Sequence, residues 1–126
     1  MKKNQDNFEI EKCYDYYSDT LGIRVTNEYN YKESIELKEG LILDFNKDNV
    51  PVALEMLDAS KLLRIKKSAL RNITNIHMKI NINSDLIRLD LSVTALLRNK
   101  PLSATANSMV INEHNIPIAD IELATV

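Results

Sequence analysis

The sequence predicts an α+β protein that consists mainly of antiparallel β-structure. Three observations support this prediction: apolar and polar residues alternate over most of the chain, a repeat relates its two halves, and a single segment has helical periodicity. Alternation is typical of strands with one face in the core and the other in water. We therefore expect one globular domain over residues 1–126, in which two β-hairpin modules, at 8–60 and 74–126, are joined by a connecting helix at 61–73.

The repeat relates residues 10–60 to residues 76–126 at a constant spacing of 66 positions. Ser18-Asp19 recurs as Ser84-Asp85. Other equivalent positions share an identical or similar residue: Asn46/Asn112, Asn49/Asn115, Pro51/Pro117, Ala53/Ala119, Leu57/Leu123, Phe45/Ile111, Val50/Ile116 and Val52/Ile118. Because a repeated unit normally buries its apolar face against its copy, we expect an internal pseudo-two-fold axis.

Each module is expected to begin with a hairpin. In the first module, apolar residues alternate over 8–16 and over 21–25, on the two sides of the Ser18-Asp19 turn. In the second, the same pattern occupies 76–82 and 87–93 around the second Ser-Asp pair.

A second hairpin follows in the first module. A short strand at 34–37 leads through Gly40 into a strand at 41–45, and the polar segment 46–49 supplies the turn before 50–57. In the copy, Pro101 stands opposite Ile35. Proline cannot donate a ladder hydrogen bond, so we expect an edge strand or a break there.

The one helical segment lies between the modules. Asp58 or Ser60 can cap it, Leu62, Leu63, Ile65, Ala69 and Leu70 form an apolar stripe, and Lys61, Arg64, Lys66, Lys67 and Arg71 surround that stripe. Because Val126 stands opposite Ser60, the second module has no room for an equivalent helix. We expect the single helix to cover or bridge both sheets.

Bulk properties restrict the setting. A chain of 126 residues can bury a stable core without disulfides, and the single cysteine, Cys13, has no partner, which favours a reducing compartment. Cys13 has the polar parity of its strand, but we interpret it as a small packing residue. The polar N-terminus and the lack of a long apolar run predict a cytoplasmic protein without a membrane partner.

Several patterns resemble catalytic or metal sites. Asp44-x-Asn46-x-Asp48 with Glu55 has the spacing of a calcium loop, but Asn49 occupies the place of the required glycine and the flanks alternate as strands, so we predict a plain turn. We interpret His77 and His114 as surface histidines. Asp19 and Asp85 could face each other in a ligand pocket between the modules, although both are good turn formers.

The glycine content argues against nucleotide chemistry. With Gly22 and Gly40 as its two glycines, the chain has no phosphate-cradling loop. We therefore expect no catalytic residue, metal or cofactor, and we do not expect an enzyme.

Part of the first module resembles a known prokaryotic family. The segments that carry the resemblance are Tyr14-Asp15, Asp19–Val25, Glu33–Leu37, Gly40–Phe45 and Ala53–Ser60. They are similar, over about residues 8–65, to the domain of unknown function 2283, with 76–126 as a degenerate second copy. The chain departs from the family pattern at Asn49, where a glycine is typical, and at Pro51.

The resemblance implies an antiparallel sheet of hairpins followed by a helix, with no established activity. Members of such small families often sit beside toxin-like genes, which implies an antitoxin-like accessory role.

From the residues we favour a non-enzymatic interaction or assembly module that forms homo-oligomers or binds a protein partner. Sheets of this kind leave edges and a helix face that partners usually cover. The expected interaction surface consists of Tyr17, Tyr29 and Tyr31 with the apolar helix residues Leu62, Leu63 and Ile65. Tyr14 and Tyr16 align with Ile80 and Ile82, which predicts core positions for both tyrosines.

The alternative is a nucleic-acid-binding regulator. Lys61, Arg64, Lys66, Lys67 and Arg71 follow one another without an intervening acid, although the net charge is −2. This alternative is less favoured, because the acidic segment 28–58 can neutralise the basic residues within the chain or in a second subunit. A small-ligand or enzyme site between the modules is the third hypothesis.

Overall fold

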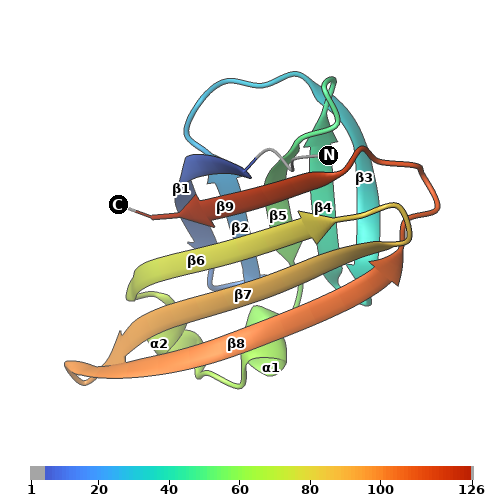
Figure 1. Ribbon diagram of the computed structural model, residues 1–126. Coiled ribbons are helices and arrows are strands. Elements are labelled where there is room, and N and C mark those ends of the chain that lie inside the picture. The colour runs from blue at the N-terminus through green and yellow to red at the C-terminus, as the bar shows by residue number, and fades with distance from the viewer. Residues whose placement is uncertain (1–4, 126) are drawn as a thin grey trace.

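The computed structural model describes residues 5–125, and nine strands of this part of the chain form one sheet that curls into a half-barrel (Figure 1). The strands are β1 Gln5–Asp15, β2 Thr20–Val25, β3 Tyr31–Lys38, β4 Leu41–Asn46, β5 Pro51–Met56, β6 Ile73–Ile82, β7 Leu86–Leu97, β8 Lys100–Ile111 and β9 Ala119–Ala124. Their order in the sheet is β3-β4-β5-β2-β1-β9-β6-β7-β8. The predicted antiparallel β-structure is confirmed for every pair of neighbours except β1 and β9.

The parallel pair β1–β9 joins two antiparallel groups of strands. Residues 10–15 of β1 pair with β2, whereas residues 5–9 of the same strand pair with residues 120–124 of β9. The last strand in the sequence therefore lies in the interior of the sheet. No alternation pattern marks such a partner, because the pattern reports which face is buried and not which strand is adjacent.

The two groups of strands face each other across one hydrophobic core. Burial alternates along β4 and β7 as the sequence predicts, and Leu41, Leu43 and Phe45 are fully buried. The core also contains residues of the second half, such as Ile80 and Leu123. Burial of this many large apolar side chains is the main stabilising term of the fold.

The prediction of one continuous connecting helix at 61–73 is wrong. Two short helices, α1 Ala59–Leu63 and α2 Lys67–Leu70, take its place. The chain breaks between them because Arg64 has a left-handed conformation (φ 56°) and Lys66 is extended (φ −59°, ψ 142°). In the described structure, the Asp58 side chain does not cap α1 as expected.

The structure does not show the predicted duplication. Both halves begin with an antiparallel hairpin, β1–β2 and β6–β7, whose turns contain the equivalent Ser-Asp pairs. Beyond the hairpins the halves differ, because β5 pairs with β2 but β9 pairs with β6. The predicted equivalence of Phe45 and Ile111 is also wrong, since Phe45 is fully buried and Ile111 is 68% exposed.

The expectation for Pro101 is confirmed. Pro101 lies near the start of β8, which forms one edge of the sheet, and pairs with Leu96 of β7. An edge strand tolerates proline because one side of its backbone has no neighbouring strand that needs a hydrogen-bond donor.

Candidate functional site

The residues predicted to form an interaction surface do not lie together. Tyr17 is 94% exposed in the β1–β2 turn, whereas Tyr31 begins β3 and pairs with Asn46 at the opposite end of the strands. Tyr29 is half-buried and packs against the core, as does Leu62. The prediction is wrong for Leu63 and Ile65, whose side chains belong to the core.

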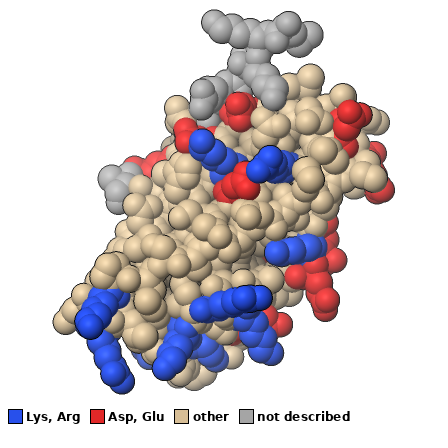
Figure 2. Space-filling view, turned by 60° about the horizontal axis from the view of Figure 1, so that its bottom comes forward, with Lys and Arg blue, Asp and Glu red and all other residues tan. Residues whose placement is uncertain are grey.

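The basic residues of the helical segment, by contrast, gather at one end of the molecule. Figure 2 shows Lys and Arg side chains concentrated there, over the helices and the neighbouring strands. The cluster consists of Lys61, Arg64, Lys66, Lys67 and Arg71, extended by Arg98 in the β7–β8 turn and by Lys100 at the start of β8. A hydrogen bond from the Leu96 backbone N–H to the Asn72 carbonyl oxygen (3.0 Å) ties the end of β7 to the segment after α2.

Arg98 and Lys100 were missed in the sequence analysis. A signal for them exists, because residues 59–84 and residues 91–112 both lack Asp and Glu. The two acid-free segments are separated by residues 85–90, but their cations lie at 61–71 and at 98–100, and the packing of α2 against β7 brings these to the same surface.

Two tyrosines adjoin the basic residues. The rings of Tyr16 and Tyr17 meet edge to face, with centroids 6.0 Å apart and planes at 89°. Lys67 Nζ lies 4.5 Å from the centroid of the Tyr16 ring, and the Arg71 guanidinium carbon lies 5.1 Å from it, so both are cation–π contacts. The prediction of a core position for Tyr16 is wrong, since its side chain is 40% exposed.

We call this surface the basic–aromatic end and define it as Tyr16, Tyr17, Lys61, Arg64, Lys66, Lys67, Arg71, Arg98 and Lys100. A groove of about 610 Å³ adjoins it, lined by Lys12, Cys13, Tyr14, Asp15, Tyr16, Tyr17, Leu70, Arg71 and Ile73. Asp15 is the carboxylate of this lining. Its Oδ1 accepts hydrogen bonds from the Tyr17 and Ser18 backbone N–H groups (3.0 and 3.4 Å), which lower the pKa of Asp15. They also fix the turn at residues 16–19, which we call the tyrosine turn.

Asp19 attaches the tyrosine turn to α1. Its buried carboxylate accepts hydrogen bonds from the Tyr14 hydroxyl (2.6 Å), the Ser60 hydroxyl (2.6 Å) and the Ser60 backbone N–H (3.1 Å). Burial opposes the charged form of Asp19, but the hydrogen bonds from Ser60 and Tyr14 outweigh it and lower the pKa of Asp19.

The same contacts correct the hypothesis that Asp19 and Asp85 face each other in a pocket. Asp85 is exposed, and its carbonyl oxygen accepts a hydrogen bond from the backbone N–H of Asn112. The two aspartates therefore have different neighbours.

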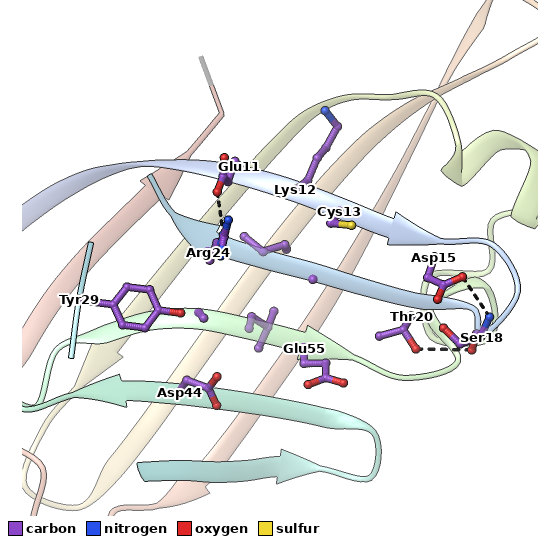
Figure 3. A pocket seen from close by; sticks show the side chains of 14 residues that line it. Glu11, Lys12, Cys13, Asp15, Ser18, Thr20, Arg24, Tyr29, Asp44 and Glu55 are labelled. Carbon is purple, nitrogen blue, oxygen red and sulfur yellow. Dashed lines mark hydrogen bonds and ion pairs between the residues drawn. The ribbon is translucent and has the colours of Figure 1, made fainter. Parts of the chain in front are cut away.

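A second groove, of about 740 Å³, lies on the outer face of β1, β2, β4 and β5 (Figure 3). Its lining includes the carboxylates of Glu11, Asp15, Asp44 and Glu55 together with Lys12, Arg24, Tyr29 and Cys13. Arg24 Nε lies 2.6 Å from Glu11 Oε1 in an exposed ion pair. Cys13 is exposed, so its interpretation as a packing residue is wrong. Within residues 5–125, His, Cys, Asp and Glu form no group of three or more that could hold a metal ion.

Each histidine contacts a carboxylate rather than the other histidine. His77 Nε2 lies 2.9 Å from Glu122 Oε1, and His114 Nδ1 lies 3.5 Å from Glu33 Oε2. Both pairs are partly exposed, where such contacts contribute little to stability.

Of the two helices in the described part of the chain, neither has the length and apolar character required to span a membrane.

Comparison with known proteins relates nearly the whole chain to archaeal proteins. The model of the family described as "Protein of unknown function (DUF2283)" matches residues 13–60. A Methanosarcina mazei protein named "Putative hypoxanthine phosphoribosyltransferase" is 31% identical over 115 residues, which cover 91% of this chain and 92% of the relative. This chain belongs to the DUF2283 family. The family match does not confirm a second copy at 76–126.

A second relative of this DUF2283 protein is an uncharacterized protein of Methanocaldococcus jannaschii. It is 32% identical over 100 residues, which cover 75% of this chain and 80% of the relative. No solved structure matches the chain.

Proposed function

We propose that this DUF2283 protein binds nucleic acid through its basic–aromatic end. The observation that supports this function is the union of seven Lys and Arg residues with two exposed tyrosines on one surface. Sequence reasoning favoured an assembly surface instead. Nucleic-acid binding is now favoured over assembly, because Leu63 and Ile65 lie in the core and are not available to a partner, while Arg98 and Lys100 enlarge the basic surface.

The charge distribution supports this proposal more than the net charge does. The chain has a net charge of −2, but none of its acids lies in 59–84 or 91–112, the two segments that supply the cations of the basic–aromatic end. A protein that neutralises phosphates with Lys and Arg releases condensed counterions, so its affinity falls steeply with salt. We expect that dependence here, because all the cations of this end except the half-buried Lys67 are exposed.

The test compares two triple charge reversals. Lys61→Glu, Lys66→Glu and Lys100→Glu together are expected to weaken oligonucleotide binding at least about tenfold, whereas Lys32→Glu, Lys38→Glu and Lys47→Glu together are expected to leave it nearly unchanged. All six lysines are exposed, and both variants change the net charge equally. Fluorescence anisotropy at low salt measures the affinities. Equal binding by the two variants, or no binding by the wild type, contradicts the proposal.

We propose binding rather than catalysis. The name of the Methanosarcina relative suggests transfer of a phosphoribosyl group, and phosphate groups of this kind are typically held by a glycine-rich loop at a helix N-terminus. In this chain Gly22 lies within β2 and Gly40 lies in the β3–β4 turn, while α1 and α2 have five and four residues. Turnover of hypoxanthine with a phosphoribosyl donor by the purified protein would contradict this part of the proposal.

A specific feature of β8 also favours the second candidate, a homo-oligomer. This edge strand has twelve residues, of which Lys100 alone is charged, and it exposes Met109 and Ile111 by 62% and 68%. The opposite edge strand, β3, is protected by four charged residues. Long uncharged edges tend to pair with another strand, and a second copy supplies one. Light scattering after size exclusion tests this candidate, and a monomer at all concentrations excludes it.

A further inference from the structure

Resting on the proposed function, we infer that the ligand is single-stranded nucleic acid, one base of which stacks on Tyr17. The Tyr17 side chain is 94% exposed, which is unusual for a large aromatic ring. The ring of Tyr16 meets the Tyr17 ring edge to face, with the centroids 6.0 Å apart. Such an arrangement leaves a ring face of Tyr17 available to a planar partner.

The position of Tyr17 is well defined by its surroundings. The Asp15 carboxylate accepts a hydrogen bond from the Tyr17 backbone N–H, and the Asp19 carboxylate connects the same turn to Ser60 in α1. Tyr16 is held between the turn and α2 by the Lys67 and Arg71 cations. A ring presented on a fixed turn loses little conformational entropy when a base stacks on it.

The surroundings of Tyr17 suit the rest of a nucleotide strand. The adjoining groove combines the cations of Lys12 and Arg71 with the apolar side chains of Leu70 and Ile73. Cations beside aromatic rings are the combination with which proteins follow a single strand, because phosphates meet the charges while bases stack on the rings. The bases of a duplex are already stacked on one another, so a duplex would use the cations and not Tyr17.

The experiment measures fluorescence anisotropy of a labelled single-stranded oligonucleotide, in DNA and RNA forms, and of a duplex of the same sequence. Tyr17→Ala is expected to weaken single-strand binding about 5- to 100-fold and to leave duplex binding unchanged. Tyr17→Phe is expected to retain the affinity, because stacking needs the ring and not the hydroxyl. The matched control is Tyr31→Ala, which removes a 52% exposed tyrosine from the opposite end of the strands.

A second readout is intrinsic fluorescence. The chain has five tyrosines and no tryptophan, so stacking of a base on Tyr17 is expected to quench tyrosine emission in the wild type more than in Tyr17→Phe, where the stacked residue is already non-emitting at that wavelength.

The outcomes separate this inference from the proposed function. Equal binding of single strand and duplex, with no effect of Tyr17→Ala, overturns the inference and leaves the proposed function standing. Failure of the wild type to bind any oligonucleotide overturns both. Vesicles of phosphatidylserine and phosphatidylcholine form the last arm, and binding to these vesicles without binding to nucleic acid would identify the basic–aromatic end as a membrane surface.

Discussion

At the scale of single residues, Asp19 holds the basic–aromatic end together. The residue is 8% exposed, and its carboxylate accepts hydrogen bonds from Tyr14 and from Ser60, which is 41 residues away in sequence. Buried charges of this kind are costly unless every oxygen finds donors. A Ser-Asp pair is also an ordinary turn sequence, so nothing in the local sequence distinguishes the buried Asp19 from the exposed Asp85.

Replacement of Asp19 by Asn tests this role. The variant keeps the size and the tolerance for the left-handed conformation (φ 55°), but it places an amide N–H₂ among hydrogen-bond donors. We expect a loss of about 1–3 kcal/mol in the free energy of unfolding, measured with urea. The matched control is Asp58→Asn, since Asp58 is also left-handed (φ 51°) but exposed. Equal stability of the two variants would contradict the role of Asp19.

The lowered pKa of the Asp19 carboxylate implies that stability depends on pH. The pKa of Asp19 in the folded protein lies below its ordinary value of 3.8, so the unfolded chain binds the proton more readily. This contribution to the free energy of unfolding is fully present above pH 3.8 and is lost as the pH falls through the lower folded pKa. Urea unfolding of wild type and Asp19→Asn across this range measures it. The difference between the two proteins should shrink in acid, and a constant difference would refute the assignment.

At the scale of the elements, the β3–β4 turn depends on Gly40. Its φ of +80° is a backbone conformation that residues with a side chain rarely adopt, and a Cβ there would lie 3.2 Å from the Leu57 carbonyl oxygen. We expect Gly40→Ala to lower the free energy of unfolding by about 1–2 kcal/mol. Gly22→Ala is the control, because its Cβ would meet an ordinary contact of 3.7 Å to the Cys13 carbonyl oxygen. That change should be neutral or slightly stabilising, and the same loss for both would disprove the argument.

The break between α1 and α2 places the Ile65 side chain in the core. In a continuous helix the stripe of Leu62, Leu63 and Ile65 could have formed a docking face, but Ile65 is 6% exposed and packs in the core. Ile65→Ala should therefore destabilise the monomer by about 2–5 kcal/mol. Leu62→Ala, at a half-buried position, should cost less. Thermal unfolding that is unchanged by Ile65→Ala would restore the docking interpretation.

Elements were predictable where local signals are strong. The hairpin around Ser18-Asp19 and the turn at Asn46–Asn49 follow from alternation and turn chemistry. The helix break was not predictable, because Arg64 and Lys66 are good helix formers. Tertiary packing overrides that propensity, since the break lets Leu63, Ile65, Ala69 and Leu70 all reach the core.

At the scale of the whole molecule, the sheet closes through β9. This strand has β1 on one side and β6 on the other, and Leu123 of β9 is fully buried. The sequence could suggest that residues 119–124 form a strand, but not that the strand pairs with the first one. Pairing between segments so far apart leaves no local pattern. An exact repeat of the β2–β5 pairing would place β9 beside β7, but β9 pairs with β6.

Leu123→Ala tests how far the fold depends on this strand. We expect a loss of about 2–5 kcal/mol and a single unfolding transition seen equally by near- and far-UV circular dichroism, because one core joins both groups of strands. The control is Glu122→Gln, which alters a partly exposed ion pair and should cost less than about 1 kcal/mol. Two separate transitions would show that the strand groups are stable independently.

The interior position of β9 also constrains biosynthesis. While the ribosome is still making residues 119–124, β1 and β6 each lack a neighbour, and the nascent polypeptide exposes two backbone edges that can capture other chains. Productive folding therefore has to wait until residues 119–124 have been made, and a frameshift or deletion that disturbs these residues is expected to yield inclusion bodies rather than a shortened but folded product.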